Sequence, residues 1–368
     1  MLKPKSEQVP GYVFFIEILK IIFFLYCFLV SIDLMGIAFK SHKEFAESFM
    51  VATSNPFISL VIGIVVTSII QSSSTTTSMI VVMVGAGTLP LANAIPMIMG
   101  ANIGTTVTNT IVSFGYAGRK IEFERSFSAA IVHDMFNIYA TLIIFPIELY
   151  TGVILKVAIF LQELLVGMGG LKFVNPLKII IQPVSQPIGD FLGDHFFILL
   201  VISLGGLFFA MSKITSVMRG IVMDKVEQVL NKYMFKNALI SLLFGMVLTA
   251  VVQSSSIATS LIIPIVGAGM LTMEQVFPYT LGANIGTTIT AMLAALTVGV
   301  PAAVTVAFAH LFFNVLGIAI LYPLKAIPIW TANTIAGYVS KSKRNFLIFA
   351  IIYILLHIVP IAFAVFTK

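Results

Sequence analysis

Two short blocks of hydroxyl and amide side chains interrupt apolar stretches of this chain. The first, Gln71–Ser78, has the sequence QSSSTTTS, and the second, Gly100–Thr106, has the sequence GANIGTT. Neutral side-chain oxygens can bind a cation, and backbone N–H groups released at a helix break can bind an anion. Unpaired polar groups in hydrocarbon are costly, so non-helical backbone persists in a membrane only where it lines a cavity. The two blocks therefore predict a site for a small anion and a cation.

Both blocks occur a second time at one constant spacing. QSSS begins at Gln71 and again at Gln253, and GANIGTT begins at Gly100 and again at Gly282, so each pair lies 182 positions apart. Between the two stretches that contain the blocks, about half of the aligned positions are identical. The chain is therefore internally duplicated, and matching interruptions in two halves are typical of the midplane site of a transporter.

A third pair of similar segments follows the GANIGTT blocks. His133 and Asn137 correspond to His310 and Asn314, which lie 177 positions later. Side chains four residues apart lie on one face of a helix. We expect these pairs either to hydrogen-bond to a neighbouring helix or to bind the ligand directly. Asp134 corresponds to a leucine in the second half, so it cannot belong to a symmetric site.

The composition excludes an ordinary soluble protein. Of the 368 residues, 59% are hydrophobic and only 10% are charged, and the mean hydropathy is +1.06. So few charges cannot cover a water-facing surface, for which about 25% is usual. The net charge of +6 lies in short clusters, which favours cytoplasmic loops over a nucleic-acid surface. Cys27 is the single cysteine, so no intrachain disulfide can form.

We predict an all-α polytopic membrane protein with two inverted repeats, each containing a re-entrant helical hairpin at QSSS and a discontinuous helix at GANIGTT. The first repeat (1–150) is expected to contain a spanning helix at 13–38, a hairpin at 56–87, a broken helix at 93–115 and a helix at 126–149. A connector (151–194) includes an interfacial segment at 152–170. The second repeat (195–368) is expected to contain a helix at 195–212, an interfacial helix at 217–236, a hairpin at 238–269, a broken helix at 274–297 and helices at 301–324 and 345–366.

The inverted arrangement depends on a count of membrane crossings. Lys3 and Lys5 predict a cytoplasmic N-terminus, and the first apolar segment is too long for a cleaved signal peptide. The first broken helix then brings Arg119 and its basic neighbours to the cytoplasmic side. Three crossings separate the two hairpins if 152–170 lies at the membrane interface, and an odd number of crossings inverts the second repeat.

The duplicated blocks resemble the type II sodium–phosphate cotransporters. Each QSSS is followed about 28 residues later by GANIGTT, and the segments 133–137 and 310–314 are also similar to that family. The resemblance covers roughly 14–366, and the short termini resemble a bacterial member. It implies sodium-driven uptake of inorganic phosphate by alternating access, with phosphate held between the two QSSS hairpins. The implied partners are phosphate, sodium and the lipid bilayer, no organic cofactor is expected, and the implied location is the bacterial inner membrane.

The resemblance also implies roles for individual residues. The residues assigned to phosphate are Ser72, Ser73, Ser74, Ser254, Ser255, Ser256 and Arg119. The residues assigned to sodium, through neutral amide and hydroxyl oxygens, are Gln71, Gln253, Asn102, Asn284, Thr105, Thr106, Thr287 and Thr288. In electrogenic members we expect an aspartate where this chain has Arg119, linked to an extra sodium site. The arginine therefore predicts electroneutral transport of two sodium ions with one divalent phosphate.

Three other interpretations fit parts of this pattern. The polar blocks could simply pair helices, as hydroxyl and amide side chains do in membranes. A sodium-coupled carrier of another oxyanion, such as arsenate or sulfate, would need a similar site. A membrane-embedded hydrolase could use Ser72 or Ser254 as nucleophile with His133 or His310 as base. No Gly-x-Ser-x-Gly motif supports the hydrolase, and a duplicated nucleophile has no obvious purpose.

Overall fold

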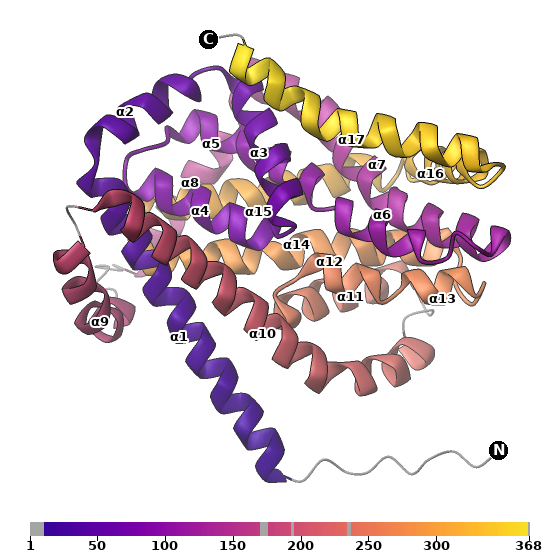
Figure 1. Ribbon diagram of the computed structural model, residues 1–368, viewed down its shortest axis with the longest axis horizontal. Helices are drawn as coiled ribbons and strands as arrows, with labels where there is room; N and C mark the ends of the chain where they lie inside the picture. The colour runs from indigo at the N-terminus through magenta and orange to yellow at the C-terminus, as the bar shows by residue number, and fades with distance from the viewer. Residues whose placement is uncertain (1–10, 170–175, 193–194, 234–236, 367–368) are drawn as a thin grey trace.

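Every element that the structure describes is an α-helix (Figure 1). The structure is a computed structural model that describes residues 11–169, 176–192, 195–233 and 237–366. Lys3 and Lys5, on which the predicted orientation depends, lie outside these residues. The C-terminal helix lies against the bundle, whereas the first helix extends away from it toward the N-terminus.

The helices follow one another with short connections. The part of the chain before residue 152 forms α1 (Gly11–Ser41), α2 (Lys43–Ala52), α3 (Pro56–Ile70), α4 (Ser73–Gly85), α5 (Leu91–Gly104), α6 (Val107–Phe114) and α7 (Lys120–Thr151). The connector forms α8 (Val153–Gly169) and α9 (Pro176–Leu192). The remainder forms α10 (Phe196–Tyr233), α11 (Ala238–Val252), α12 (Ser255–Ser260), α13 (Ile263–Gly267), α14 (Met273–Val298), α15 (Pro301–Leu321), α16 (Ala326–Val339) and α17 (Lys343–Phe366).

Several of these helices are long and apolar enough to cross a membrane. Within the described residues there are five, in α1, α7, α10, α14 and α15. A sixth is possible if α2 and α3, which are bent by 105° at their junction, form one broken or re-entrant element. Large apolar side chains such as Phe15, Phe209 and Ile351 are exposed on the outer helices, as expected for a surface that faces lipid. The protein is therefore an all-α, multi-pass membrane protein, as predicted.

Glycines allow two helix pairs to pack unusually closely. The helix α3 lies along α5, and α11 lies along α14. A Cβ atom added to Gly100 would lie 2.0 Å from the carbonyl oxygen of Leu60, and one added to Gly282 would lie 1.9 Å from that of Leu242. Only glycine fits at either position. Small residues drive helix association in membranes in this way, because they let two backbones approach.

The structure differs from the predicted elements in the second half. The second GANIGTT block does not interrupt its helix, because α14 is continuous over Met273–Val298. The predicted helices at 195–212 and 217–236 are joined in one helix, α10 (Phe196–Tyr233), because no proline or glycine separates them; residues 234–236 lie outside the described residues. The helices α2, α9 and α16 were not predicted. Of these, α9 contains Pro183 and Pro187, which argue against a helix in sequence.

Candidate functional site

The two QSSS turns have the same backbone conformation. Gln71 and Gln253 end α3 and α11 with φ angles of 55° and 58°, and they are the only non-glycine residues with positive φ in the described chain. The next residues, Ser72 and Ser254, are extended, and their hydroxyl oxygens accept the N–H groups of Thr75 and Ile257. Each turn thus ends one helix and caps the next within two residues. The left-handed glutamines are strained positions, which are frequent at functional sites.

Hydrogen bonds join the first hairpin to the second. The Ser74 hydroxyl donates to the backbone oxygen of Gln253 at 3.2 Å. Thr290, from α14, donates to the side-chain oxygen of Gln253 at 2.6 Å and lies 3.5 Å from the Ser74 hydroxyl. Ser74 of the first half therefore meets Gln253 and Thr290 of the second half, each more than 170 positions away in sequence. The structure brings the two predicted substrate-binding turns together.

The helix break in the first half contributes a backbone oxygen to the same region. At Thr105–Thr106, between α5 and α6, the regular α-helical hydrogen bonding is interrupted, although both residues keep right-handed helical dihedral angles. The N–H of Asn109 donates to the backbone oxygen of Thr106 rather than to that of Thr105. The released oxygen of Thr105 accepts the hydroxyl of Ser256, from the second hairpin, at 3.3 Å. A released carbonyl oxygen beside hydroxyl groups is suited to coordinate a cation.

One hydroxyl of the second turn is buried without a partner. The Ser255 Oγ atom has no hydrogen bond within the described part of the chain, although the residue is only 2% exposed. Ser73, its counterpart in the first turn, is also buried. Buried hydroxyl groups are normally hydrogen-bonded, so an unpaired one needs an explanation such as an absent ligand or water.

Six side chains form a buried network between the two halves. Asn102 donates to Asn314 at 2.7 Å, and its oxygen accepts His310 Nε2 at 3.1 Å. In the matching contacts, Asn284 donates to Asn137 at 2.7 Å and accepts His133 Nε2 at 2.6 Å. Each asparagine of a GANIGTT block is therefore held by the histidine and asparagine of the other half.

The same network is closed by contacts within each half. Asn137 donates to the Asn102 backbone oxygen at 3.0 Å, and Asn314 donates to the Asn284 backbone oxygen at 3.3 Å. Asn102 and Asn284, assigned to sodium in sequence, therefore use their side chains to join helices. Neither histidine contacts a serine: Nε2 of each is bonded to asparagine, and Nδ1 of each has no partner among the described residues. The contact that a serine hydrolase needs is not present.

The remaining predicted residues differ in their surroundings. The threonines of the two blocks donate to carbonyl oxygens of their own helices, at 2.6–2.9 Å: Thr105, Thr106, Thr287 and Thr288. Gln71 is exposed, and none of the hydrogen bonds between the hairpins involves it. Arg119 lies before α7, is 75% exposed and pairs with Glu122 at 2.9 Å. Arg119 therefore does not join the contacts between the hairpins.

Sequence reasoning missed three residues of this region. Asn109 and Thr259 hydrogen-bond to each other across the halves at 2.7 and 3.0 Å, and Thr290 holds Gln253 as described above. Asn109 and Thr290 each lie within six residues after the end of a GANIGTT block. This short distance from the block is the one sequence signal that could have identified them. Thr259 corresponds to Thr77 of the first half, 182 positions earlier.

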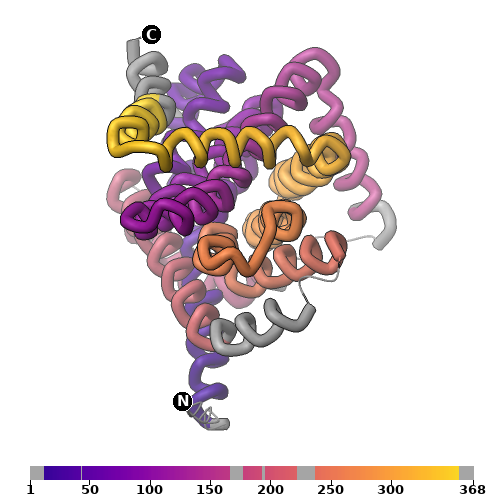
Figure 2. Tube along the Cα trace, turned by 90° about the vertical axis from the view of Figure 1, so that its right-hand side faces the viewer, coloured from indigo at the N-terminus to yellow at the C-terminus, as the bar shows by residue number. Residues whose placement is uncertain are grey.

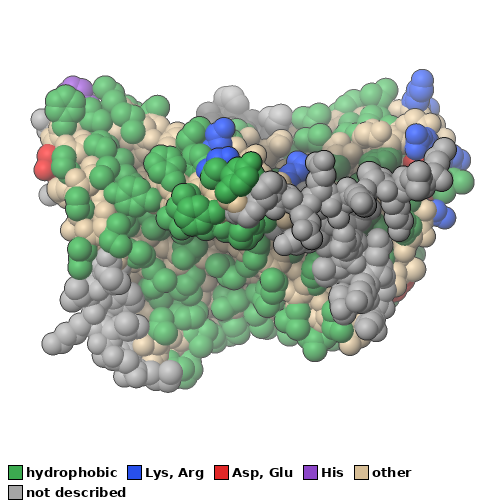
Figure 3. All heavy atoms as spheres, turned by 90° about the horizontal axis from the view of Figure 1, so that it is seen from below, with side chains coloured by type: hydrophobic (Ala, Val, Ile, Leu, Met, Phe, Trp, Pro, Cys, Tyr) green, Lys and Arg blue, Asp and Glu red, His purple; other side chains and the backbone are tan. Residues whose placement is uncertain are grey.

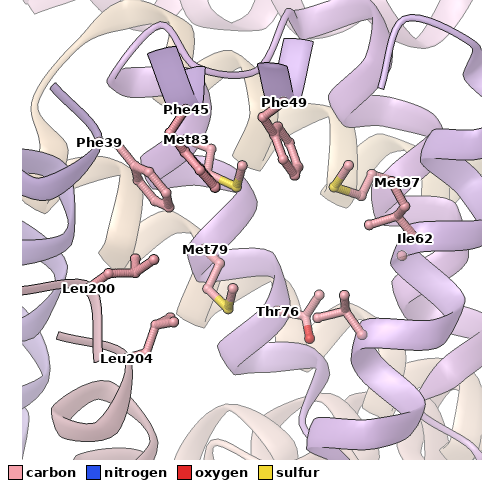
Figure 4. A pocket seen from close by; sticks show the side chains of 12 residues that line it. Phe39, Phe45, Phe49, Ile62, Thr76, Met79, Met83, Met97, Leu200 and Leu204 are labelled. Carbon is pink, nitrogen blue, oxygen red and sulfur yellow. The ribbon is translucent and has the colours of Figure 1, made fainter. Parts of the chain in front are cut away.

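An apolar cavity of about 140 Å³ borders the first hairpin on another side (Figure 4). Phenylalanines of α1 and α2 and the methionines Met79, Met83 and Met97 surround it, and Thr76 is its one polar lining side chain. The Thr76 hydroxyl already donates to the backbone oxygen of Ser72 at 3.1 Å. An anion would be poorly stabilised there, so the cavity is not a second candidate for the polar site.

Duplicated hairpin turns that meet at buried hydroxyl groups, inside an all-α multi-pass membrane protein, are typical of membrane transporters. The chain matches the model of the Na⁺/Pi-cotransporter family over residues 27–172 and 207–326, one stretch in each half. It belongs to that family. The intervening residues 173–206 include α9 and half of the connector.

Several curated proteins are similar to this chain over most of its length. Sodium-dependent phosphate transport protein 2A of Rattus norvegicus is 32% identical, over 90% of this chain and 64% of its own length. Sodium-dependent phosphate transport protein 2B is 30% identical in Homo sapiens, over 89% of this chain and 62% of its own, and 30% identical in Bos taurus, over 95% and 64%. The chain thus spans less than two thirds of each relative. No solved structure gives a significant match.

Proposed function

We propose that this protein couples the inward movement of sodium to the uptake of inorganic phosphate, with phosphate bound between the two QSSS turns. The proposal rests chiefly on the contact between these turns, where Ser74 meets Gln253 and Ser256 meets Thr105. Membership of the Na⁺/Pi-cotransporter family and the names of the relatives support the choice of sodium and phosphate.

The proposed phosphate ligands are hydroxyl groups at the beginning of the second helix of each hairpin. Ser255 is buried and has an unpaired hydroxyl in the described chain, so a phosphate oxygen would complete its hydrogen bonding. Ser73 is its counterpart and begins α4, a helix of 13 residues whose N-terminal dipole favours an anion. Ser72, Ser74, Ser254 and Ser256 complete the two turns.

The proposed sodium ligands are neutral oxygens around the same turns. The Thr105 carbonyl, released by the helix break, and the side-chain oxygen of Gln253 are two such atoms that lie at the contact between the halves. Sodium ions prefer oxygen ligands. If the oxygen ligands are neutral, the negative charge of the bound phosphate balances the positive charge of the sodium ions. Arg119 is exposed and adds no carboxylate, which favours two sodium ions for each divalent phosphate and hence electroneutral transport.

A difference between the halves supports alternating access as the transport mechanism. One GANIGTT helix is broken and the other is continuous, although the blocks are identical in sequence. In a protein with two equivalent repeats, an exchange of the two conformations would open the site to the opposite side of the membrane. We propose such an exchange as the transport step.

Uptake of labelled phosphate into proteoliposomes tests the function. We expect uptake when a sodium gradient is imposed and none when potassium replaces sodium. Ser73→Ala and Ser255→Ala should each lower the rate at least about tenfold, since each removes a charge-assisted hydrogen bond to phosphate. Ser260→Ala is the matched control, because its hydroxyl bonds only to the backbone of its own helix. Equal uptake in sodium and potassium, driven by a pH gradient alone, would contradict the proposal.

Current measurement on a solid-supported membrane tests electroneutrality separately. Phosphate added outside the liposomes, in the presence of external sodium, should evoke no sustained current, because two sodium ions balance a divalent phosphate. A third sodium would move one net charge, worth about 2.3 kcal/mol per 100 mV. A sustained inward positive current, with uptake accelerated by a negative interior, would show that a third ion is coupled.

A further inference from the structure

A pocket with two basic residues and a mainly apolar lining lies at one end of the molecule, outside the hairpin contacts. Its volume is about 430 Å³, and it is formed by the connection between α6 and α7 together with the connection between α16 and α17. Both connections lie at the right-hand end of Figure 1, and Figure 2 shows α16, in gold, crossing this end. The pocket therefore opens where helices end rather than in the middle of the bundle.

Two lysines face this pocket without a counterion. Lys120 is the first residue of α7, and Lys343 is the first residue of α17. Neither forms an ion pair with any residue that the structure describes. Because the N-terminus of a helix is already positive, a lysine there is unfavourable unless an anion lies nearby. Two exposed lysines at two converging helix ends give the pocket a positive potential that favours an anion.

The acidic residues nearby are engaged with other groups. Glu122 pairs with Arg119 at 2.9 Å, and Glu124 accepts the hydroxyl of Ser340 at 3.1 Å. Glu124 is exposed and bonded to the pocket wall, so it lowers the local positive potential without neutralising either lysine. Ser342 also lines the pocket, and its hydroxyl can donate to an anion while its oxygen caps α17.

The other walls of the pocket are apolar. Phe123 and Phe346 lie with their ring centroids 6.0 Å apart, and Leu347 is 58% exposed beside them. These side chains continue from the lysines along the surface of α17, which is itself apolar. A cationic mouth with an apolar wall fits a molecule that has an anionic group and a hydrocarbon chain. A free inorganic ion would leave the apolar wall uncovered.

We propose that this pocket binds the phosphate headgroup of an anionic phospholipid, with an acyl chain along Phe346 and Leu347. Lys120 and Lys343 bracket the phosphate, and the Ser342 hydroxyl donates to it. Basic pockets between helix ends on the cytoplasmic side are suited to such headgroups. Lys and Arg side chains gather at this end of the molecule (Figure 3), as they do in the cytoplasmic parts of membrane proteins.

Native mass spectrometry of the delipidated full chain tests the proposal without sodium or transport, so its result is independent of the proposed function. We expect one molecule of dioleoylphosphatidylglycerol to bind per chain, in preference to dioleoylphosphatidylcholine. Lys120→Ala with Lys343→Ala should weaken this binding about thirtyfold, because each basic residue near an anionic headgroup contributes about fivefold. Lys40→Ala with Lys156→Ala removes the same charge from exposed positions outside the pocket and should leave binding unchanged.

Two further arms keep the result unambiguous. The charge-preserving pair Lys120→Arg and Lys343→Arg should retain binding, which excludes misfolding as the cause of any loss. Millimolar inorganic phosphate should not displace the lipid, since it cannot cover the apolar wall. The proposal is overturned if the double alanine variant binds phosphatidylglycerol as the control does, if phosphatidylcholine binds equally well, or if inorganic phosphate displaces the lipid.

Discussion

Residues 60–108 and 242–290 are about half identical, yet they fold differently at the end of the same GANIGTT block. In the first stretch, α5 ends at Gly104 and α6 starts at Val107. In the second, α14 continues without interruption. The difference teaches that the block permits a helix break but does not impose one.

The residues after the block explain which helix breaks. The first block is followed by VTNTIVSF, which is rich in β-branched and polar residues, and the second by ITAMLAALTV, which is rich in alanine, leucine and methionine. Per residue, the first set is less favourable in a helix by up to about 0.7 kcal/mol. In addition, Ser256 stabilises the break by donating to the Thr105 oxygen that it releases.

The largest expected effect tests what the two stretches share. Gly100→Ala and Gly282→Ala should each prevent folding, because the new Cβ atom would overlap a backbone oxygen. Overpacking usually costs about 1–3 kcal/mol, and it costs more where the backbone cannot move away. Yield and thermal unfolding in detergent measure this. Gly205→Ala is the control, since nothing lies within 4 Å of its added Cβ. A folded Gly282→Ala protein with normal stability would refute the close packing of α11 on α14.

The next effect concerns the buried network. Asn102→Ala and Asn284→Ala should each lower the free energy of unfolding by about 1–3 kcal/mol, because each leaves buried partners unpaired. The two losses should be similar, since the contacts match in pairs. Thermal unfolding of both variants provides the comparison. A loss at one asparagine alone would show that the network is not shared equally by the halves.

A smaller effect should separate the two glutamines. Gln253 is held by Thr290, whereas Gln71 is exposed, so the structure distinguishes them despite identical backbone conformations. Gln253→Ala should raise the sodium concentration for half-maximal uptake by about fivefold, the equivalent of one lost interaction, and Gln71→Ala by less. Sodium titration of phosphate uptake measures both. Equal shifts would mean that the two glutamines are equivalent during transport.

The smallest effect is expected at Arg119, which lies in the first half only. Arg119→Ala should change the phosphate uptake rate by less than about twofold, because its exposed ion pair with Glu122 contributes little. Uptake at saturating and at low phosphate concentrations checks this. A strong rise in the phosphate concentration for half-maximal uptake would show that Arg119 does contribute to phosphate binding.

The sequence predicted the elements that depend on local signals. The hairpin predicted from residue 56 begins where α3 does, at Pro56, and the change from apolar residues to Gln71 indicates the end of α3. The sequence did not predict which half of the chain supplies the hydrogen-bond partners of each GANIGTT block. Asn102 could have met His133 of its own half, but it meets His310, because that choice depends on how the helices pack. The pocket between α7 and α17 is a tertiary feature of the same kind.

The paired contacts of the network have a consequence for how such a chain can originate. The hydrogen bond from Asn102 to Asn314 and the one from Asn284 to Asn137 are equivalent: in each, the asparagine of one half's GANIGTT block donates to the corresponding asparagine of the other half. Contacts of this reciprocal form are those that a twofold axis generates between the subunits of a homodimer. A single half expressed alone would leave its buried amide without a partner, and two copies together would satisfy both. If two copies of the gene for one half were fused, the fusion would therefore link two subunits whose buried contacts were already complete in the homodimer.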